Sequence, residues 1–142
     1  MKKFVFSMEK ILDLREYEEK QAQIELGKAI ADAEKIRQQL NFVATEKAKM
    51  LSMDISGTSI NERLVHENYL VRLDRQKEVL LEELAAAELI VEEKRAVFAE
   101  ALKKRKVLSN LKEKQLQQYK KEKQLEEDNI VDDIVTSRFK SK

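Results

Sequence analysis

Apolar residues recur along most of the chain at alternating intervals of three and four, the pattern of a coiled coil. A spacing that averages 3.5 residues keeps one edge of a helix, here called its seam, against a partner helix. The seam of the first half is Met8, Leu12, Arg15, Glu19, Ala22, Leu26, Ala29, Ala33, Ile36, Leu40, Val43, Lys47 and Met50. The seam of the second half is Leu70, Leu73, Lys77, Leu80, Leu84, Ala87, Val91, Lys94, Phe98, Ala101, Arg105 and Leu108. The pattern predicts two long helices.

One short cluster of turn-forming residues separates the two seams. Gly57 can adopt a positive φ at little cost, and Ser59 with Glu62 three residues later matches a capping box. We therefore expect a first helix at about 7–51, a turn at about 52–59 and a second helix at about 59–137. The chain is expected to form a single all-α coiled-coil domain over residues 1–142, an antiparallel hairpin of two long helices.

The position of the turn sets the expected register of the hairpin. If the chain reverses near residue 56 or 57, opposing residues have numbers that add to about 113, and apolar seam positions then face one another. Glu19 faces Lys94 under this rule, which pairs two opposite charges. His66, the only histidine, faces Lys47 as a polar seam residue near the turn. The alternative is an intermolecular coiled coil with the same seams, but the short break favours a hairpin within one chain.

The second helix is the longer one, with roughly 115 Å against roughly 65 Å at the usual rise per residue. Met8 is expected near Arg105, so about thirty residues of the second helix form a C-terminal overhang. Phe4 and Phe6 either fold back onto the second helix near residues 105–111 or enter a partner. Apolar residues of the overhang are candidates for partner contact: Leu108, Leu111, Leu116, Tyr119, Leu125, Ile130, Ile134, Val135 and Phe139.

The composition agrees with long helices and disfavours a compact core. Charged residues make up 39% of the chain and aromatic residues only 6%, and there is no Pro and no Cys. The net charge of +1 argues against a general nucleic-acid binder, which needs a surplus of positive charge. No apolar run is long enough to cross a bilayer, and the first residues do not resemble a signal peptide. We expect a cytoplasmic protein.

Catalytic chemistry has little support in these residues. A single histidine without cysteine is a poor basis for a metal site, and no glycine-rich phosphate loop or Ser-His-acid arrangement is present. We expect no enzyme activity, no cofactor and no metal ion. The basic run Lys103 to Lys106 has two readings, a solvated helix face or a patch for an acidic protein surface.

Both ends of the chain carry recognisable sequence elements. Near the N-terminus these are Phe4-Val5-Phe6, Met8 to Arg15, and Glu18, Glu19 and Ala22. Near the C-terminus they are Arg105-Lys106-Val107-Leu108, Leu111-Lys112, Tyr119, Glu126-Glu127 and Asp132-Asp133-Ile134. In these elements the chain resembles the FliJ family of the bacterial flagellar type III export apparatus. The resemblance covers nearly the whole chain, including its length and its single break.

The resemblance implies an antiparallel coiled coil similar in shape to the central stalk of rotary ATPases. Family members bind the hexameric export ATPase through the coiled-coil ends near both termini, contact the membrane-embedded export gate FlhA, and in some cases bind export chaperones. By position, the ATPase-binding candidates are Phe4, Phe6, Arg15, Arg105, Lys106, Leu108, Leu111 and Tyr119. The gate-binding candidates are Tyr69, Leu73, Gln76 and Leu80. Gln76 and Leu80 depart from the small residue and the histidine expected in the family, and Leu73 and Leu80 also belong to the seam.

The function expected from this resemblance is that of a non-enzymatic stalk in flagellar protein export. It would bind the export ATPase, link it to the export gate, and escort export chaperones, while associating with the inner-membrane flagellar base through protein partners. The alternative is a generic coiled-coil tether or substrate-holding chaperone without an ATPase partner. The two differ in whether function depends on the terminal residues or on the seam and its length.

Overall fold

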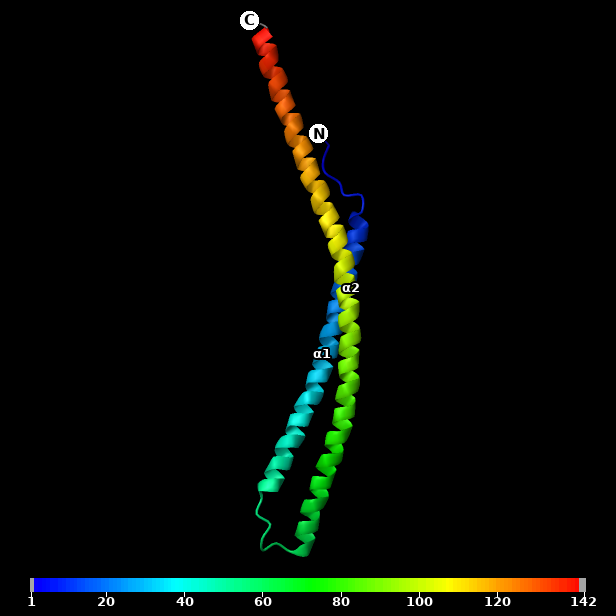
Figure 1. The fold of residues 1–142 in the computed structure, drawn as a ribbon, viewed down its shortest axis with the longest axis vertical. Helices are drawn as coiled ribbons and strands as arrows, with labels where there is room; N and C mark the ends of the chain where they lie inside the picture. The colour runs from blue at the N-terminus through cyan, green and yellow to red at the C-terminus, as the bar shows by residue number, and fades with distance from the viewer. Residues whose placement is uncertain (1, 141–142) are drawn as a thin grey trace. The chain divides into compact units, whose positions relative to one another are not determined.

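The computed structural model describes residues 2–140 and is all-α (Figure 1). Helix α1 spans Glu9–Ser52 and helix α2 spans Ile60–Lys140, and no strand occurs among the described residues. The two helices run antiparallel, and the contacts between them form the helical hairpin that the seams predict. Residues Lys2 to Phe6 precede α1 as an extended segment, here called the N-terminal segment.

The ends of the helices follow from local hydrogen bonds. Helix α1 begins two residues later than expected because residues 7 and 8 form a turn, in which the Glu9 N–H donates to the Phe6 carbonyl at 3.1 Å. Helix α2 begins with the predicted cap, in which the Glu62 N–H donates to Ser59 Oγ at 3.1 Å. It continues three residues further than expected, to Lys140.

The turn between the helices is built from side chains that bond to nearby backbone. Asp54 Oδ1 accepts hydrogen bonds from the Ser56 N–H at 2.9 Å and from the Ser56 hydroxyl at 2.6 Å. The Thr58 N–H and hydroxyl both donate to the Ile55 carbonyl, at 3.2 and 2.6 Å. Gly57 between them has a φ of +84°, so its predicted use of positive φ is confirmed.

The contacts divide the chain into two units. The turn unit comprises Gln21–Phe98 and contains the turn (Figure 1). Its main core cluster is made of Ala29, Ala33, Ala87 and Val91, with Leu26, Ile36 and Leu84 packed against it, and Val43 and Leu73 are buried nearer the turn. These are mostly small side chains, which allow two helices to approach closely but remove little apolar area from water per turn.

The terminal unit comprises Met1–Lys20 and Ala99–Lys142, so it joins the two ends of the chain. Its core contains Phe6, Leu12 and Leu108, with Phe4, Met8 and Leu111 packed against them. We call these six residues the terminal cluster. Its side chains are larger than those of the other core, and three of them, Phe4, Phe6 and Met8, come from outside either helix.

Burial follows the predicted seams closely. Every member of the first seam is buried or half-buried, from Met8, just before α1, to Met50 near its end. In α2 only Lys77 among the seam residues is exposed. The seam positions are therefore confirmed by the structure.

The expected register is wrong away from the turn. Lys47 bonds Asp74, not His66, with Nζ 2.6 Å from Oδ1, and Glu19 bonds Arg105, not Lys94. Both partners lie about a heptad or more further along α2 than expected. The physical reason is that both seams repeat every seven residues, so sliding one past the other by a heptad again places apolar against apolar. The seam pattern alone does not choose between these registers.

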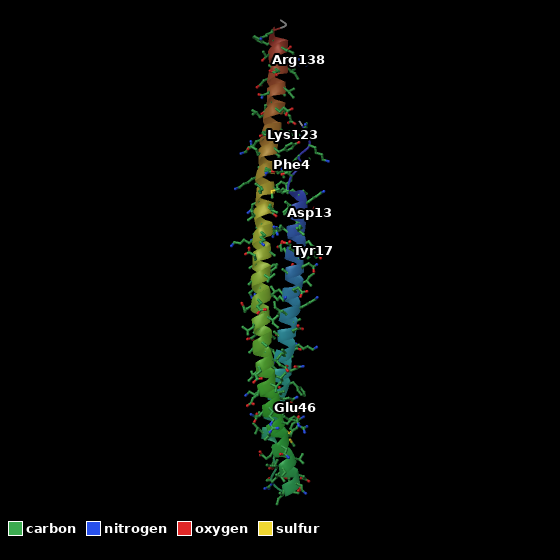
Figure 2. All side chains as sticks on the ribbon, turned by 90° about the vertical axis from the view of Figure 1, so that its right-hand side faces the viewer. Phe4, Asp13, Tyr17, Glu46, Lys123 and Arg138 are labelled. Carbon is green, nitrogen blue, oxygen red and sulfur yellow. The ribbon has the colours of Figure 1, made fainter. Side chains whose placement is uncertain are left out.

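The C-terminal overhang is shorter than expected because the start of α1 pairs with Lys112, about a heptad further along α2, and because the N-terminal segment covers the next turns. Leu108 is buried and Leu111 and Tyr119 are half-buried by the chain's own residues. An extended chain advances about 3.3 Å per residue and a helix only 1.5 Å, so a few extended residues cover several turns of α2. Every side chain from 121 to 140 is exposed, and Figure 2 shows α2 there, from Lys123 to Arg138, without a second helix beside it.

Candidate functional site

The eight residues expected to contact an ATPase all lie in the terminal unit. Four of them meet in the terminal cluster, where Phe6 is 4% exposed and Leu108 is 7% exposed. Of the two alternatives for Phe4 and Phe6, the structure therefore has the one in which they fold back onto α2. The burial of Phe6 and Leu108 means that they hold the N-terminal segment on α2 and present little surface of their own.

Tyr119 fastens the outer end of the N-terminal segment. Its hydroxyl donates a hydrogen bond of 2.6 Å to the Lys2 carbonyl, and its ring centroid lies 5.5 Å from that of Phe4 in a tilted arrangement. Figure 2 marks Phe4 on the segment that leads into α1. A sequence element from the N-terminus and one from α2 thus form a single surface.

Two ion pairs join α1 to α2 in the terminal unit. Arg105 donates to both carboxylate oxygens of Glu19, with Nε at 2.7 Å and a terminal nitrogen at 3.1 Å, and this hydrogen bonding lowers the pKa of Glu19. Lys112 Nζ lies 2.9 Å from the Glu9 carboxylate, which raises the pKa of Lys112. Glu9 and Lys112 were not singled out from the sequence, although their opposite charges on facing helices were visible there.

The remaining cationic candidates, Arg15 and Lys106, take no part in these two ion pairs. Arg15 bonds Glu18 on its own helix at 3.0 Å, and its side chain is 32% exposed. Lys106 is exposed and no described residue bonds its side chain; its charge acts on Glu19 only at longer range. The terminal unit therefore offers Lys106, Arg15 and the half-buried rings of Phe4 and Tyr119 as accessible groups.

The four gate-binding candidates all lie in the turn unit. Leu73 is 3% exposed and belongs to the hairpin core. Tyr69 is half-buried, and its hydroxyl donates to Glu46 at 3.2 Å; burial, followed by this hydrogen bond, raises its pKa. Gln76 is exposed and Leu80 is half-buried, and these two lie together on a groove between the helices.

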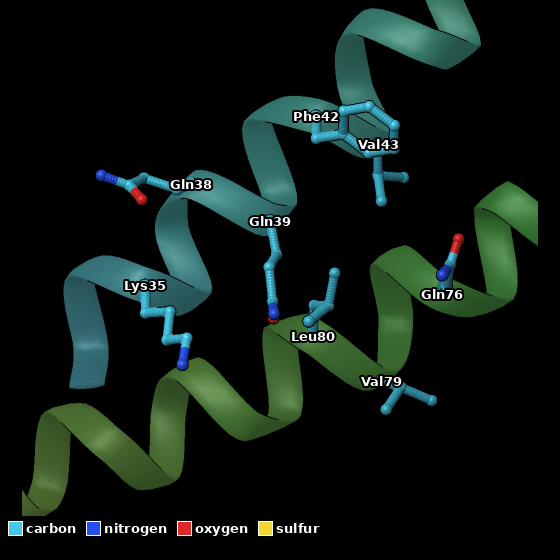
Figure 3. Close-up of a pocket in the computed structure, with 8 residues that line it drawn as sticks. All are labelled: Lys35, Gln38, Gln39, Phe42, Val43, Gln76, Val79 and Leu80. Atoms are coloured by element: carbon cyan, nitrogen blue, oxygen red, sulfur yellow. The ribbon is translucent and has the colours of Figure 1, made fainter.

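That groove has a volume of about 530 Å³ and is open to solvent. Figure 3 shows Lys35 and Gln39 reaching from α1 toward α2, with Gln39 beside Leu80. Phe42, which is 64% exposed, lies at one end of the groove, and Val79 is 54% exposed on the α2 side. Sequence reasoning missed Phe42 and Val79 because they lie off the seam. The signal was present, since an aromatic residue off the seam has to be exposed.

A second groove lies at the turn itself. It encloses about 580 Å³ and is mainly apolar, lined among others by Met50, Met53 and Val65. His66 lies half-buried on its wall with Nε2 2.8 Å from the Met50 carbonyl, while its Nδ1 is buried without a hydrogen-bond partner. The histidine thus ties the start of α2 to the end of α1.

Within residues 2–140, no three His, Cys, Asp or Glu side chains are grouped so that they could hold a metal ion. Neither helix of the described chain contains a stretch long and apolar enough to span a membrane.

Comparison with known proteins gives one family. Residues 4–142 match the sequence model of the family described as "Flagellar FliJ protein". No curated protein and no solved structure matches the chain. The match extends over both terminal sequence elements and the turn between the helices.

Proposed function

The chain belongs to the flagellar FliJ family and is thus a component of flagellar protein export, and from this premise we propose that it is a non-enzymatic stalk. In this proposal it binds the hexameric export ATPase through its terminal unit and links it to the export gate FlhA through its turn unit. It acts in the cytoplasm at the inner-membrane base of the flagellum, held there by its protein partners.

The contact between the N-terminal segment and α2 from Leu108 to Tyr119 is the observation that carries the proposal. All eight ATPase-binding candidates lie in the terminal unit, and the Phe4–Tyr119 contact joins residues that are far apart in the sequence. A ring ATPase that binds this surface contacts the start of α1 and the later part of α2 at once. Contacts that differ between subunits around the ring would then bias their conformations.

The exposed end of α2 supports the stalk interpretation. A single helix has a diameter of about 10–12 Å, narrow enough for the central opening of a ring where a globular domain would not fit. In its last three turns, Ile130, Val131, Ile134 and Val135 are spaced so that they lie beside one another on the helix. Ile130, Ile134 and Phe139 are 52%, 50% and 82% exposed, so they are available to a partner.

The groove of the turn unit supports a gate contact. Gln76 and Leu80 lie on it together with the exposed ring of Phe42, which supplies the kind of aromatic anchor that protein interfaces favour. We propose that Tyr69, Phe42, Gln76 and Leu80 form the contact with the gate, with Leu73 supporting them from the core. Export chaperones are further proposed partners of the same protein.

The test is the rate of ATP hydrolysis by the purified export ATPase from the same organism, with and without this protein, together with light scattering to follow ring assembly. We expect the wild-type chain to raise the rate and to promote rings. The double variant Ile134→Ser with Phe139→Ser should lose this effect while circular dichroism shows the helices intact. Phe42→Ser serves as the control, because it removes another exposed aromatic residue, 64% exposed against 82% for Phe139, from the turn unit and should weaken only the binding of FlhA.

A helical wild-type chain that neither binds the ATPase nor changes its rate would contradict the proposal. The alternative would then be a coiled-coil tether or substrate-holding chaperone without an ATPase partner. Equal loss of stimulation in the Phe42→Ser control would show that the two surfaces do not have separate partners.

A further inference from the structure

Positive charge is concentrated in one stretch of α2. Residues 103–123 contain nine Lys and Arg side chains but only Glu113 and Glu122, whereas the whole chain has a net charge of +1. The five acidic residues between 126 and 133 follow directly without a basic one. Because like charges on one helix repel one another, such a stretch reduces helix stability unless something else interacts with it.

Part of this charge is neutralised by α1 and part is not. Arg105 and Lys112 face α1 and pair with Glu19 and Glu9. Lys103, Lys106, Lys114 and Lys121 are exposed, and no side chain among the described residues forms an ion pair or hydrogen bond with them.

These four lysines lie on one face of α2. They are separated by three, eight and seven residues. Offsets of three and of seven bring helical side chains back to one side, and eight positions differ from seven by less than a third of a turn. Asn110 and Gln117 fill the same face, and both are exposed. We call this face, which points away from α1, the lysine stripe.

The chemistry of the lysine stripe favours an acidic protein over other anionic partners. A membrane-binding helix presents several large apolar residues beside its lysines, whereas here Val107, which is 62% exposed, is the one apolar residue beside them, and Leu108 and Leu111 face the terminal cluster. A nucleic-acid surface would be expected to contain arginine or aromatic side chains for phosphates and bases, and the stripe has neither. The amide of Asn110 suits a partner with polar side chains, while that of Gln117 donates to Glu113 at 2.9 Å.

We propose that the lysine stripe binds an acidic surface of the export ATPase. This inference rests on the proposed function and adds to it the chemistry of the contact. It places the main electrostatic contact on the outer face of α2 at Lys103, Lys106, Lys114 and Lys121, and not on Arg105, which is already paired with Glu19. The terminal cluster then holds α2 in place while the outer face meets the ring.

The test compares two quadruple variants that remove the same charge. In the stripe variant the four lysines become Gln, which keeps high helix propensity. In the control variant four exposed lysines elsewhere become Gln, namely Lys20, Lys28, Lys49 and Lys77. Affinity for the ATPase is measured at low and at moderate ionic strength. We expect the stripe variant to bind about tenfold more weakly at low salt, and the control variant to bind like the wild type.

The salt dependence provides the second readout. Wild-type affinity should fall as ionic strength rises, since the Debye length shrinks to about 10 Å at 0.1 M, and the fall should be smaller in the stripe variant. Equal affinity of the stripe variant and the wild type would overturn the inference and leave the stalk proposal standing. Failure of the wild type itself to bind the ATPase would overturn both.

Two further measurements identify a different use of the stripe. One is cosedimentation with vesicles that contain phosphatidylglycerol, and the other is light scattering of the chain alone at low salt. If the stripe variant loses only vesicle binding or only self-association, and keeps its affinity for the ATPase, the lysines serve a lipid surface or a second copy and the inference is wrong.

Discussion

Among single residues, Arg105 and Glu19 make the most specific contact between the helices of the terminal unit. Their two hydrogen bonds use both carboxylate oxygens, and their side chains are 26% and 18% exposed, less than in the other ion pairs of the described chain. Partial shielding from water strengthens a charged contact relative to an exposed one. The pair therefore fixes the register in a place where the seam pattern does not.

The ionisation of Glu19 gives this pair a defined pH dependence. The pKa of Glu19 is lowered from its ordinary value of 4.5, mainly by the hydrogen bond from Arg105. A group with a lowered folded-state pKa stabilises the fold above its unfolded value, and this contribution is lost as the pH falls through the folded value. Glu19→Gln should therefore lower the melting temperature by about 1–4 °C at neutral pH and leave it unchanged at about pH 2.

Thermal unfolding followed by circular dichroism at both pH values measures this effect. Glu100→Gln is the matched control, because Glu100 is exposed in the same unit and no described side chain pairs with it. It should change the melting temperature at neither pH. A Glu19→Gln difference that persists in acid would show that the carboxylate acts through its shape and not through its charge.

At the scale of the helices, the two glycines have opposite roles. Gly27 lies in the middle of α1, and a Cβ added there would have no neighbour within 4 Å. Gly27→Ala should raise the free energy of unfolding by about 0.5–1 kcal/mol, since alanine loses less backbone entropy in a helix.

Gly57→Ala should lower the free energy of unfolding by about 1–2 kcal/mol, because φ at Gly57 is +84°. Urea denaturation of the two variants and the wild type checks both signs. A destabilised Gly27→Ala variant would mean that the glycine is needed for a close approach.

The sequence was sufficient to predict which face of each helix is buried. Ala33, which is 1% exposed, lies on a seam that repeats over many turns, and a repeat of that length leaves little freedom in which face packs. The sequence did not predict the register of the two helices. A heptad slip preserves the seam, so the partners of Lys47 and Glu19 depend on charge pairs and turn geometry that the apolar pattern does not contain.

The candidate surfaces were predictable only in part, for two physical reasons. The N-terminal segment is extended, so it has no helical periodicity, and its larger rise per residue carries the Lys2 carbonyl as far as Tyr119. Phe42 was missed because an exposed aromatic residue on a helix is common on protein surfaces and becomes notable only beside a groove. Both features need coordinates from two parts of the chain at once.

At the scale of the whole molecule, the two cores differ in how far apart in the sequence their contacting segments lie. The two helical segments of the turn unit are joined by the short turn between Ser52 and Ile60. The terminal unit joins Met1–Lys20 to Ala99–Lys142, and without a folded turn unit this contact would close a loop of all the residues between them. The entropy of closing such a loop costs about 4 kcal/mol. If the chain is a single domain, as predicted, the folding of the terminal unit depends on the folding of the turn unit.

This dependence is testable with two matched substitutions, Leu73→Ala in the core of the turn unit and Leu108→Ala in the terminal cluster. Each removes a nearly buried leucine, 3% and 7% exposed, at a cost of about 2–5 kcal/mol. Hydrogen exchange measured by mass spectrometry should show weaker amide protection in both units of the Leu73→Ala variant, but only in the terminal unit of the Leu108→Ala variant. Leu89→Ala, at a leucine that is 67% exposed, should leave both units protected. Full protection of the terminal unit in the Leu73→Ala variant would mean that its core, built on Phe6 and Leu12, is stable enough to offset loop closure, and that the chain contains two domains.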